Sequence, residues 1–202
     1  MARNDSKGVD RQARRRPGRS SQEDPRTRAL VMAVQDGEEA ALKLLFSIWN
    51  PRFLAHAARL SGERDAAVDI VQEAWLSVIP SLARLNDPGR FRAWAYRIVT
   101  NKSADWVRQR MRERKMMTDL SVEMELDAAA APDLEALSEA QRLRQLVAAL
   151  PFGQRALLVL YYVEGFTVAE IAEALSIKTG TVKSRLHFAR QSLRHKIERK
   201  ES

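Results

Sequence analysis

The sequence offers few of the side chains that catalyse reactions or bind metals. It has three histidines, His56, His187 and His195, and no cysteine, so disulfides, thiolate ligands and cysteine nucleophiles are excluded. The histidines lack the HExxH spacing of a zinc site, and the eight glycines form neither GxGxxG nor a P-loop. Acidic pairs occur, but none stands beside a nucleophile pattern. These patterns argue against an enzyme, and we predict neither a cofactor nor a metal.

The chemistry that the sequence does supply is positive charge. Lys and Arg number 34 against 26 Asp and Glu, a net charge of +8 with a pI near 10.2. Where such an excess gathers on one face it indicates a polyanionic partner, nucleic acid before an anionic membrane. The longest apolar run, 156–163, is far shorter than the ~20 residues of a membrane helix. The N-terminus lacks the apolar stretch of a secretory signal, so we expect a cytoplasmic protein without membrane insertion.

The charge is arranged in blocks along the chain. Residues 1–28 contain nine basic and four acidic residues and few apolar ones. Residues 84–115 hold ten basic against three acidic residues, and 178–200 hold eight against one. Between these basic blocks, 116–140 has seven acidic residues and no basic one. An acidic stretch with weak apolar periodicity between basic blocks is typical of a linker between two domains.

The apolar pattern predicts an all-α fold, because no sustained alternation of Val, Ile or Thr calls for strands. We expect two small helical domains joined by a flexible acidic linker, the second domain containing a helix-turn-helix. The predicted divisions are a disordered basic arm at 1–23, a first domain at 24–115, the linker at 116–132 and a second domain at 133–202. The predicted helices are 25–37, 38–60, 63–82, 90–114, 133–149, 152–164, 168–175 and 179–197.

The helix-turn-helix is indicated by two short apolar stripes that meet across almost no loop. They comprise Val168, Ile171, Ala172 and Leu175 in the first helix and Val182, Leu186, Ala189, Leu193 and Ile197 in the second. Ala172 is small where crossing helices approach, and Ile177 can fill the junction. Ser176 stands where the turn usually has glycine, so we expect a less comfortable backbone there. The second helix of such a pair lies in the DNA major groove.

The polar face of this second helix predicts which groups touch DNA. Side chains projecting from its start reach base edges, and flanking basic groups reach phosphates. We expect Lys183, Ser184 and His187 to read bases and Lys178, Arg185 and Arg190 to contact the backbone, while Phe188 also projects outward. The alternative is an amphipathic helix with a solvated basic face. The compact turn and the absence of acidic residues from 178 to 197 argue against it.

The first domain carries two further charged faces. Asp69 and Glu73 lie one turn apart with Gln72 beside them, which is either a solvated acidic face or a docking surface for a basic partner. The 91–115 segment crowds basic residues beside aromatic ones, a combination that suits single-stranded DNA. We expect Trp94 and Trp106 to be ordinary core residues, whereas the basic face remains to be explained.

Together these segments resemble bacterial sigma factors of the extracytoplasmic-function (ECF) group of the sigma-70 family. DIVQEAWLSV and FRAWAYRIVTNKSADWVR are similar to the family's region two. LPFGQRALLVLYYVEGFTVAEIAEALSIKTGTVKSRLHFARQSLR, Leu150 to Arg194, is similar to its region four. The resemblance covers about 24–200 and implies an alternative sigma factor, responsive to stress or another signal, that binds core RNA polymerase and promoter DNA.

The resemblance also assigns roles to individual residues. The resemblance implies that Asp69, Gln72 and Glu73 dock on the clamp helices of the largest polymerase subunit, beta-prime. It also implies that region four contacts the beta flap. Asn86 and Asp87 are expected to capture a flipped base of the minus-ten element. Contacts with the non-template strand of this element are expected from Arg92, Arg97, Asn101 and Lys102. Reading of the minus-thirty-five element falls to Lys183, Ser184, His187 and Phe188. The acidic linker matches a segment that threads toward the RNA exit channel.

One other reading of the chain stays open at this point. A DNA-binding regulator could end in the same helix-turn-helix and use its first domain to sense a ligand or dimerise. A second basic helix suited to DNA is not expected in a sensor domain, and binding to core polymerase separates the two classes. Sigma factors of this group are commonly inhibited by an anti-sigma factor, a further partner that no segment of the sequence encodes.

Overall fold

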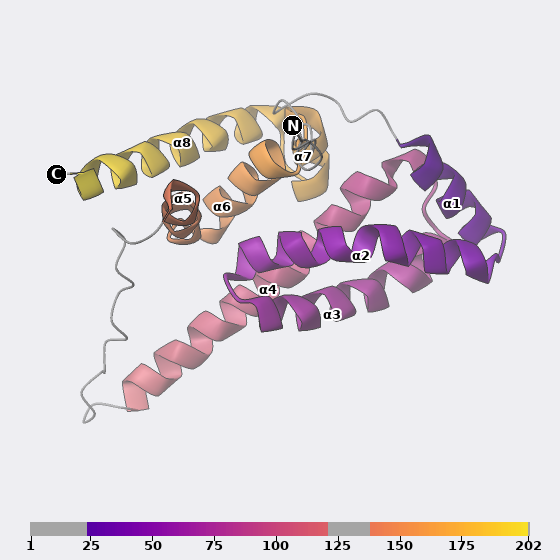
Figure 1. Cartoon of the computed structure of the whole chain (residues 1–202), viewed down its shortest axis with the longest axis horizontal. Coiled ribbons are helices and arrows are strands. Elements are labelled where there is room, and N and C mark those ends of the chain that lie inside the picture. Colours follow the sequence, from indigo (N-terminus) through magenta and orange to yellow (C-terminus); the bar gives the residue numbers. More distant parts are fainter. Residues whose placement is uncertain (1–23, 121–137, 202) are drawn as a thin grey trace, which may run out of the picture.

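The computed structural model describes residues 24–120 and 138–201, and every regular element in these two ranges is a helix. The predicted all-α class is therefore confirmed. The helices form an N-terminal unit, α1 to α4, and a C-terminal unit, α5 to α8, which lie against one another (Figure 1). None of the helices in the described ranges is both long and apolar enough to cross a bilayer. The predicted arm at 1–23 lies outside the described residues.

The N-terminal unit consists of α1 (Pro25–Gln35), α2 (Glu39–Ser61), α3 (Arg64–Leu82) and α4 (Phe91–Leu120), with a short 3-10 turn, η1 (Pro88–Arg90), before α4. Asp24 caps the start of α1 by accepting a hydrogen bond from the Arg26 amide. Gly62 ends α2 with a φ of 85°, a left-handed conformation that costs glycine little. The predicted starts and ends of α1, α2 and α3 agree with these bounds to within about two residues.

Aromatic side chains from α2, α3 and α4 fill the core of this unit. Trp49 and Phe53 of α2 pack against Phe91 and Tyr96 of α4, and Phe53 also meets Trp75 of α3, with ring centroids 5.4 to 6.3 Å apart. Several of these contacts are edge-to-face, the arrangement that aromatic quadrupoles favour. Rings at these distances fix the angle between α2 and α4 and thereby orient the polar face of α4.

The C-terminal unit consists of α5 (Glu139–Ala148), α6 (Phe152–Leu158), α7 (Val168–Leu175) and α8 (Thr179–Glu201), with a π-helical turn, η2 (Val159–Val163), after α6. Capping boxes open both α5 and α7: Ser138 pairs with Gln141, and Thr167 pairs with Glu170. The sequence predicted one helix over 152–164, and the structure divides it into α6 and η2 because the last turn widens to π geometry.

Two other predicted bounds differ from the structure. Helix α4 extends to Leu120 rather than 114, so the first five residues of the predicted acidic linker are helical. Helix α5 starts at Glu139 rather than 133. The remainder of the predicted linker, with the first residues of the predicted second domain, lies outside the described residues.

The two units share one buried apolar cluster rather than two separate cores. Helix α7 packs on α4, and α6 approaches α2. Phe166, just before α7, is fully buried against Tyr96 of α4, with ring centroids 5.1 Å apart. The C-terminal part of α4 extends beyond α2 and α3 (Figure 1). The units therefore meet along the N-terminal half of α4, which carries Arg92, Arg97 and Lys102.

Candidate nucleic-acid and polymerase interfaces

Helices α7 and α8 form the predicted helix-turn-helix. Ile171 and Ala172 of α7 are buried with Val182, Leu186 and Ala189 of α8, as their spacing predicted. The turn between them contains Ser176 at φ 54° and ψ 45°, the only non-glycine residue with positive φ among the described residues. Its amide bonds back to the Ala172 and Glu173 carbonyls, so the turn ends α7 within a single residue.

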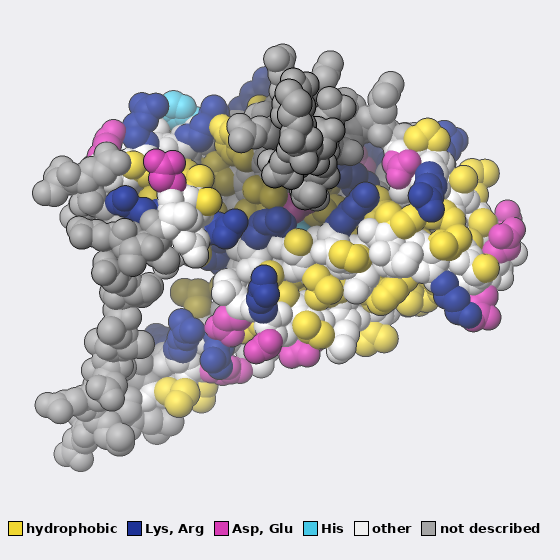
Figure 2. All heavy atoms as spheres, viewed as in Figure 1, with side chains coloured by type: hydrophobic (Ala, Val, Ile, Leu, Met, Phe, Trp, Pro, Cys, Tyr) yellow, Lys and Arg dark blue, Asp and Glu magenta, His cyan; other side chains and the backbone are white. Residues whose placement is uncertain are grey.

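The opposite face of α8 is open to solvent. Figure 2 shows Lys and Arg side chains gathered over α8 at the upper left. Phe188 is 59% exposed and lies beside His187, their ring centroids 5.9 Å apart. All seven residues that we expect to contact duplex DNA are exposed on or just before this helix: Lys178, Lys183, Ser184, Arg185, His187, Phe188 and Arg190. Their contacts with DNA stay predictions.

The loop that carries Asn86 and Asp87 is held from two sides. Both residues are exposed, and the Asp87 carboxylate accepts a hydrogen bond of 3.0 Å from the Gly89 amide. The side-chain amide of Gln35, at the end of α1, donates to the carbonyls of Leu82, at 3.0 Å, and Leu85, at 2.9 Å. Gln35 therefore clamps the start of the loop to α1. No signal in the sequence identified Gln35, because its partners lie 47 and 50 positions away.

The predicted DNA-contacting residues of α4 differ in their exposure to solvent. Arg97 and Asn101 are exposed, and Lys102 is half-buried with its Nζ 3.2 Å from a Glu73 oxygen. The Arg92 side chain is only 20% exposed and points toward the C-terminal unit. Trp94 and Trp106 are partly buried and pack against the apolar cluster, as the core interpretation predicted. The basic surface of α4 is thus open in its middle and covered at its start.

The exposed face of α3 carries the predicted docking residues. Asp69, Gln72 and Glu73 are all exposed, and Leu76, one turn further on, is 76% exposed. Figure 2 shows acidic side chains along the lower edge, over α3. A large exposed apolar side chain beside acidic ones is more typical of a protein interface than of a purely solvated face. Sequence reasoning had not selected Leu76.

Comparison with known families decides between these readings. A family model described as "Sigma-70 region 2" matches residues 45–113, and one described as "Sigma-70, region 4" matches 140–193. The chain is 34% identical over 176 residues to the ECF RNA polymerase sigma factor ShbA of Streptomyces griseus, a match that covers 82% of this chain and 92% of that protein. This chain belongs to the ECF group of sigma-70 family factors.

Other members of the family match over different lengths. The sigma factor is 38% identical over 142 residues to SigE of Mycolicibacterium smegmatis, and the match covers 68% of this chain but only 54% of that protein. The sigma factor thus spans about half the length of that relative. The solved structure of CnrH in complex with the cytosolic domain of CnrY superimposes with a TM-score of 0.63 at 26% identity, covering 86% of this chain and 97% of CnrH.

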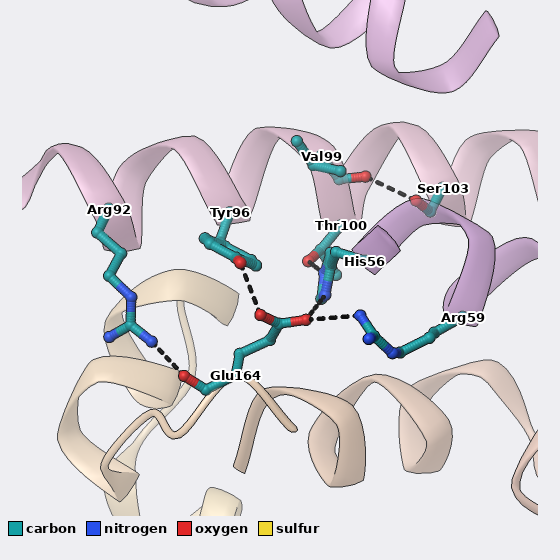
Figure 3. Close-up of polar contacts among 8 residues, drawn as sticks. All are labelled: His56, Arg59, Arg92, Tyr96, Val99, Thr100, Ser103 and Glu164. Carbon is teal, nitrogen blue, oxygen red and sulfur yellow. Dashed lines mark hydrogen bonds and ion pairs between the residues drawn. The ribbon is translucent and has the colours of Figure 1, made fainter. Parts of the chain in front are cut away.

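In this sigma factor, a buried carboxylate joins the region-two and region-four units (Figure 3). Glu164, which follows η2, is 12% exposed, and its Oε2 accepts a 2.6 Å hydrogen bond from the Tyr96 hydroxyl. Its Oε1 lies 3.3 Å from Nδ1 of His56 and 3.4 Å from a guanidinium nitrogen of Arg59. The main-chain oxygen of Glu164 accepts a further hydrogen bond from Arg92. One residue of the C-terminal unit therefore contacts α2 and α4 of the other.

The imidazole of His56 is oriented by this network. His56 is fully buried, and its Nε2 lies 3.0 Å from the Thr100 hydroxyl. Because an ionised carboxylate can only accept hydrogen bonds, the Nδ1–H of His56 is assigned as the donor to Glu164. In the neutral ring, Nε2 then accepts a hydrogen bond from the Thr100 hydroxyl. Both ring nitrogens are thus satisfied without a metal or water. His56 therefore supports the contact between the two units.

The network also shifts the pKa values of two groups. Burial on its own raises the pKa of Glu164, but the hydrogen bond and attraction from His56, the Tyr96 hydroxyl and the charge of Arg59 outweigh it and hold the pKa below the ordinary value of 4.5. Burial, followed by the adjacent Glu164 carboxylate, raises the pKa of Tyr96 far above its ordinary value. Glu164 is therefore ionised and Tyr96 is a neutral donor at physiological pH.

A buried arginine provides a second link between the units. Arg155 of α6 donates a 2.6 Å hydrogen bond to the carbonyl of Leu60, in the last turn of α2, and another to the carbonyl of Ala148 in α5. A cation at a helix C-terminus is favourable because the last carbonyls lack intrahelical partners. Burial lowers the pKa of Arg155 below its ordinary value. Phe152 packs on a small apolar cluster of Leu60, Ala156 and Val159. This cluster and the arginine together fix α6 against α2.

Proposed function

We propose that this sigma factor binds core RNA polymerase and directs initiation at promoters by reading a minus-thirty-five element with α8 and a minus-ten element with α4 and the loop before it. The polymerase supplies the catalysis, and the sigma factor supplies specificity. The observation that carries the proposal is the presence of two surfaces suited to DNA on separate units of one chain that belongs to the ECF group.

The two surfaces suit different forms of DNA. The convex exposed face of α8, with its basic flanks, matches the major groove of a duplex. The loop exposes the short polar side chains of Asn86 and Asp87, and the helix after it exposes Arg97 and Asn101, a combination that suits an unstacked base and its strand. Unstacking costs a few kcal/mol, which contacts to the flipped base must offset. Region four thus anchors the protein while region two traps melted DNA.

Docking on the polymerase is assigned to α3. Its exposed acidic residues complement a basic partner, and Leu76 adds apolar area that becomes buried in the complex. We also expect the beta flap to contact region four, and a protein inhibitor of the anti-sigma kind to bind this sigma factor. The CnrH structure, a complex with the cytosolic domain of CnrY, favours such a partner. This activity places the protein in the cytoplasm, where the polymerase and the chromosome are.

Transcription by a sigma-free core polymerase tests the proposal directly. The full-length chain is mixed with core polymerase from an ECF-containing bacterium and fragmented genomic DNA of its own species, and transcript starts are sequenced. We expect reproducible starts downstream of a shared pair of sequence elements. A related ECF factor in the same reaction is the positive control, and transcription with that factor but none with this chain contradicts the proposed function.

A further inference from the structure

The start of α4 faces acidic groups of the C-terminal unit. The guanidinium of Arg92 lies 3.9 Å above the ring centroid of Phe166 and 3.6 Å from the carboxylate of Glu170, and it donates to the main-chain oxygen of Glu164. A cation over an aromatic face and beside a carboxylate is stabilised by both groups. Arg92 is thus held by region four in the free protein.

Arg90, which ends the loop that carries Asn86 and Asp87, is also paired across the interface. Its Nε lies 3.3 Å from a carboxylate oxygen of Glu173 on α7, closer than the 3.9 Å to Asp87 in its own loop. Arg90 and Glu173 are both largely exposed, so this ion pair alone is weak. Its importance lies in its position, because it ties the end of the loop that is expected to take the flipped base to α7.

We propose that the free sigma factor is closed on itself. The Glu164 carboxylate holds the two units together through Tyr96, His56 and Arg59, and the Glu170 and Glu173 carboxylates occupy Arg92 and Arg90, which region two otherwise offers to the minus-ten strand. The proposal rests on the proposed function, since it takes Arg92 to be a strand contact. The carboxylates stand where phosphates of the strand would stand. Region four thereby competes with promoter DNA for the start of α4.

The closed arrangement also conflicts with promoter geometry. The two elements lie about 25 base pairs apart, and at 3.4 Å per base pair this is about 85 Å along a duplex. In the closed form α7 packs directly on α4, so the two DNA-reading surfaces cannot reach both elements together. Binding of the promoter therefore requires the units to separate and the contacts at Glu164 to break.

The chain between the units is long enough for their interface to open. Seventeen residues, 121–137, connect the last described residue of α4 to Ser138. A chain of this length reaches at most about 60 Å when extended. Separation therefore requires no rearrangement within either unit, only loss of the interface contacts, and their strength sets the fraction of open molecules.

The experiment measures closure and strand binding in the same protein. Because the chain has no cysteine, Ser47→Cys and Arg144→Cys introduce one dye site on each unit for energy transfer. The test variant combines Glu164→Gln and Glu173→Gln, which keep side-chain volume. The matched control, Glu39→Gln with Glu139→Gln, removes the same charge from exposed positions away from the interface. Binding of a labelled single-stranded oligothymidine of about 20 nucleotides reports access to region two.

We expect high energy transfer in the wild-type protein and in the control. Loss of a charge-assisted hydrogen bond in a buried network commonly changes an equilibrium by about tenfold, so the open fraction of the test variant rises by about that factor. Its affinity for the oligothymidine rises in parallel. Equal transfer in the test variant and the wild type overturns the proposal, and so does an opened variant that binds the strand no better than the control.

Two further measurements show whether a negative result contradicts the closure proposal, reflects a misfolded variant or contradicts the proposed function. Glu173→Gln alone changes an exposed residue and cannot unfold the protein, so it must still raise strand affinity by a smaller factor than the double variant. Core polymerase added to the wild type must lower energy transfer as the holoenzyme forms. If the chain directs transcription but its units never close, the closure proposal is wrong and the proposed function stands.

Discussion

The hydroxyl of Tyr96, in the second turn of α4, donates a 2.6 Å hydrogen bond to the carboxylate of Glu164, in the other unit of the chain. The same tyrosine ring packs edge-to-face on Phe53 and on His56. Tyr96 therefore joins the aromatic core of region two to the polar contact that holds region four. A substitution that removes only its hydroxyl separates these two roles.

Replacing Tyr96 with phenylalanine is expected to weaken closure and leave the aromatic core in place. The change removes one donor from a buried carboxylate, a loss of about 1 to 3 kcal/mol. Energy transfer between the dyes on the two units measures the shift. Tyr162→Phe, at an exposed position, is the matched control and should change nothing. Unchanged transfer in Tyr96→Phe would show that this hydrogen bond does not contribute to closure.

Closure is expected to weaken in acid. The pKa of Glu164 is lower in the closed form than its ordinary value of 4.5, so its contribution is fully present above the open-state pKa. That contribution is lost as the pH falls through the lowered closed-state pKa, because the protonated carboxyl no longer accepts from His56 and Arg59 as a charged group. Energy transfer followed from pH 7 downward should fall below about pH 4.5 in the wild type. The step should be smaller in the Glu164→Gln variant, because the contribution of this carboxylate is absent, and an identical step in both proteins contradicts the assignment.

Gln35→Ala is expected to impair capture of the flipped base without impairing region four. The variant frees the carbonyls of Leu82 and Leu85 and so loosens the loop that carries Asn86 and Asp87. Wild-type holoenzyme should bind a minus-ten strand more tightly than the same strand with an abasic position at the captured base. We expect Gln35→Ala to reduce this discrimination by about tenfold, because two hydrogen bonds position the loop.

If Gln35 only stabilises the fold, the Gln35→Ala variant should give a different result. General loss of stability lowers affinity for both strands equally and leaves their ratio unchanged. Gln109→Ala, an exposed position later in α4 whose amide pairs with Glu113, is the control. Partial rescue by Gln35→Asn is not expected, because the shorter side chain cannot reach both carbonyls.

Glu73→Arg is expected to weaken binding to core polymerase by at least about tenfold. The substitution reverses the charge on the proposed docking face and places a second cation beside Lys102, whose Nζ lies 3.2 Å from Glu73. Binding is measured by competition with a labelled sigma factor for core polymerase. Glu39→Arg makes the same charge change on α2, outside the docking face, and should bind normally. Normal binding by Glu73→Arg removes α3 from the docking surface.

Ser176→Gly is expected to stabilise the protein modestly. A left-handed conformation costs a non-glycine residue about 1 to 2 kcal/mol, and the greater freedom of glycine in the unfolded chain offsets part of this gain. The net increase should be about 0.5 to 1 kcal/mol in the free energy of unfolding, measured by urea denaturation. Ser192→Gly, inside α8, should have the opposite sign, because helical φ and ψ favour serine over glycine.

The sequence by itself determined the local structure and the family. The spacing of apolar residues predicted which faces of α7 and α8 are buried. The position of Ser176, where glycine is usual, indicated the left-handed turn. The blocks of charge along the sequence indicated the basic surfaces. These features depend on residues within a few positions of one another, where helix geometry fixes which side chains share a face. The same local patterns produced the resemblance to regions two and four.

Only the tertiary structure decided how the two units meet. The partners of Glu164 lie 68 to 108 positions away along the chain, and those of Gln35 lie 47 and 50 positions away. Such pairs have no local periodicity, because they form only after several helices have packed at particular angles. Arg92 shows the consequence: its place in the sequence indicates a DNA contact, and its place in the fold shows it held by Phe166 and Glu170. A long-range contact depends on the packing of the whole core, which no short segment encodes.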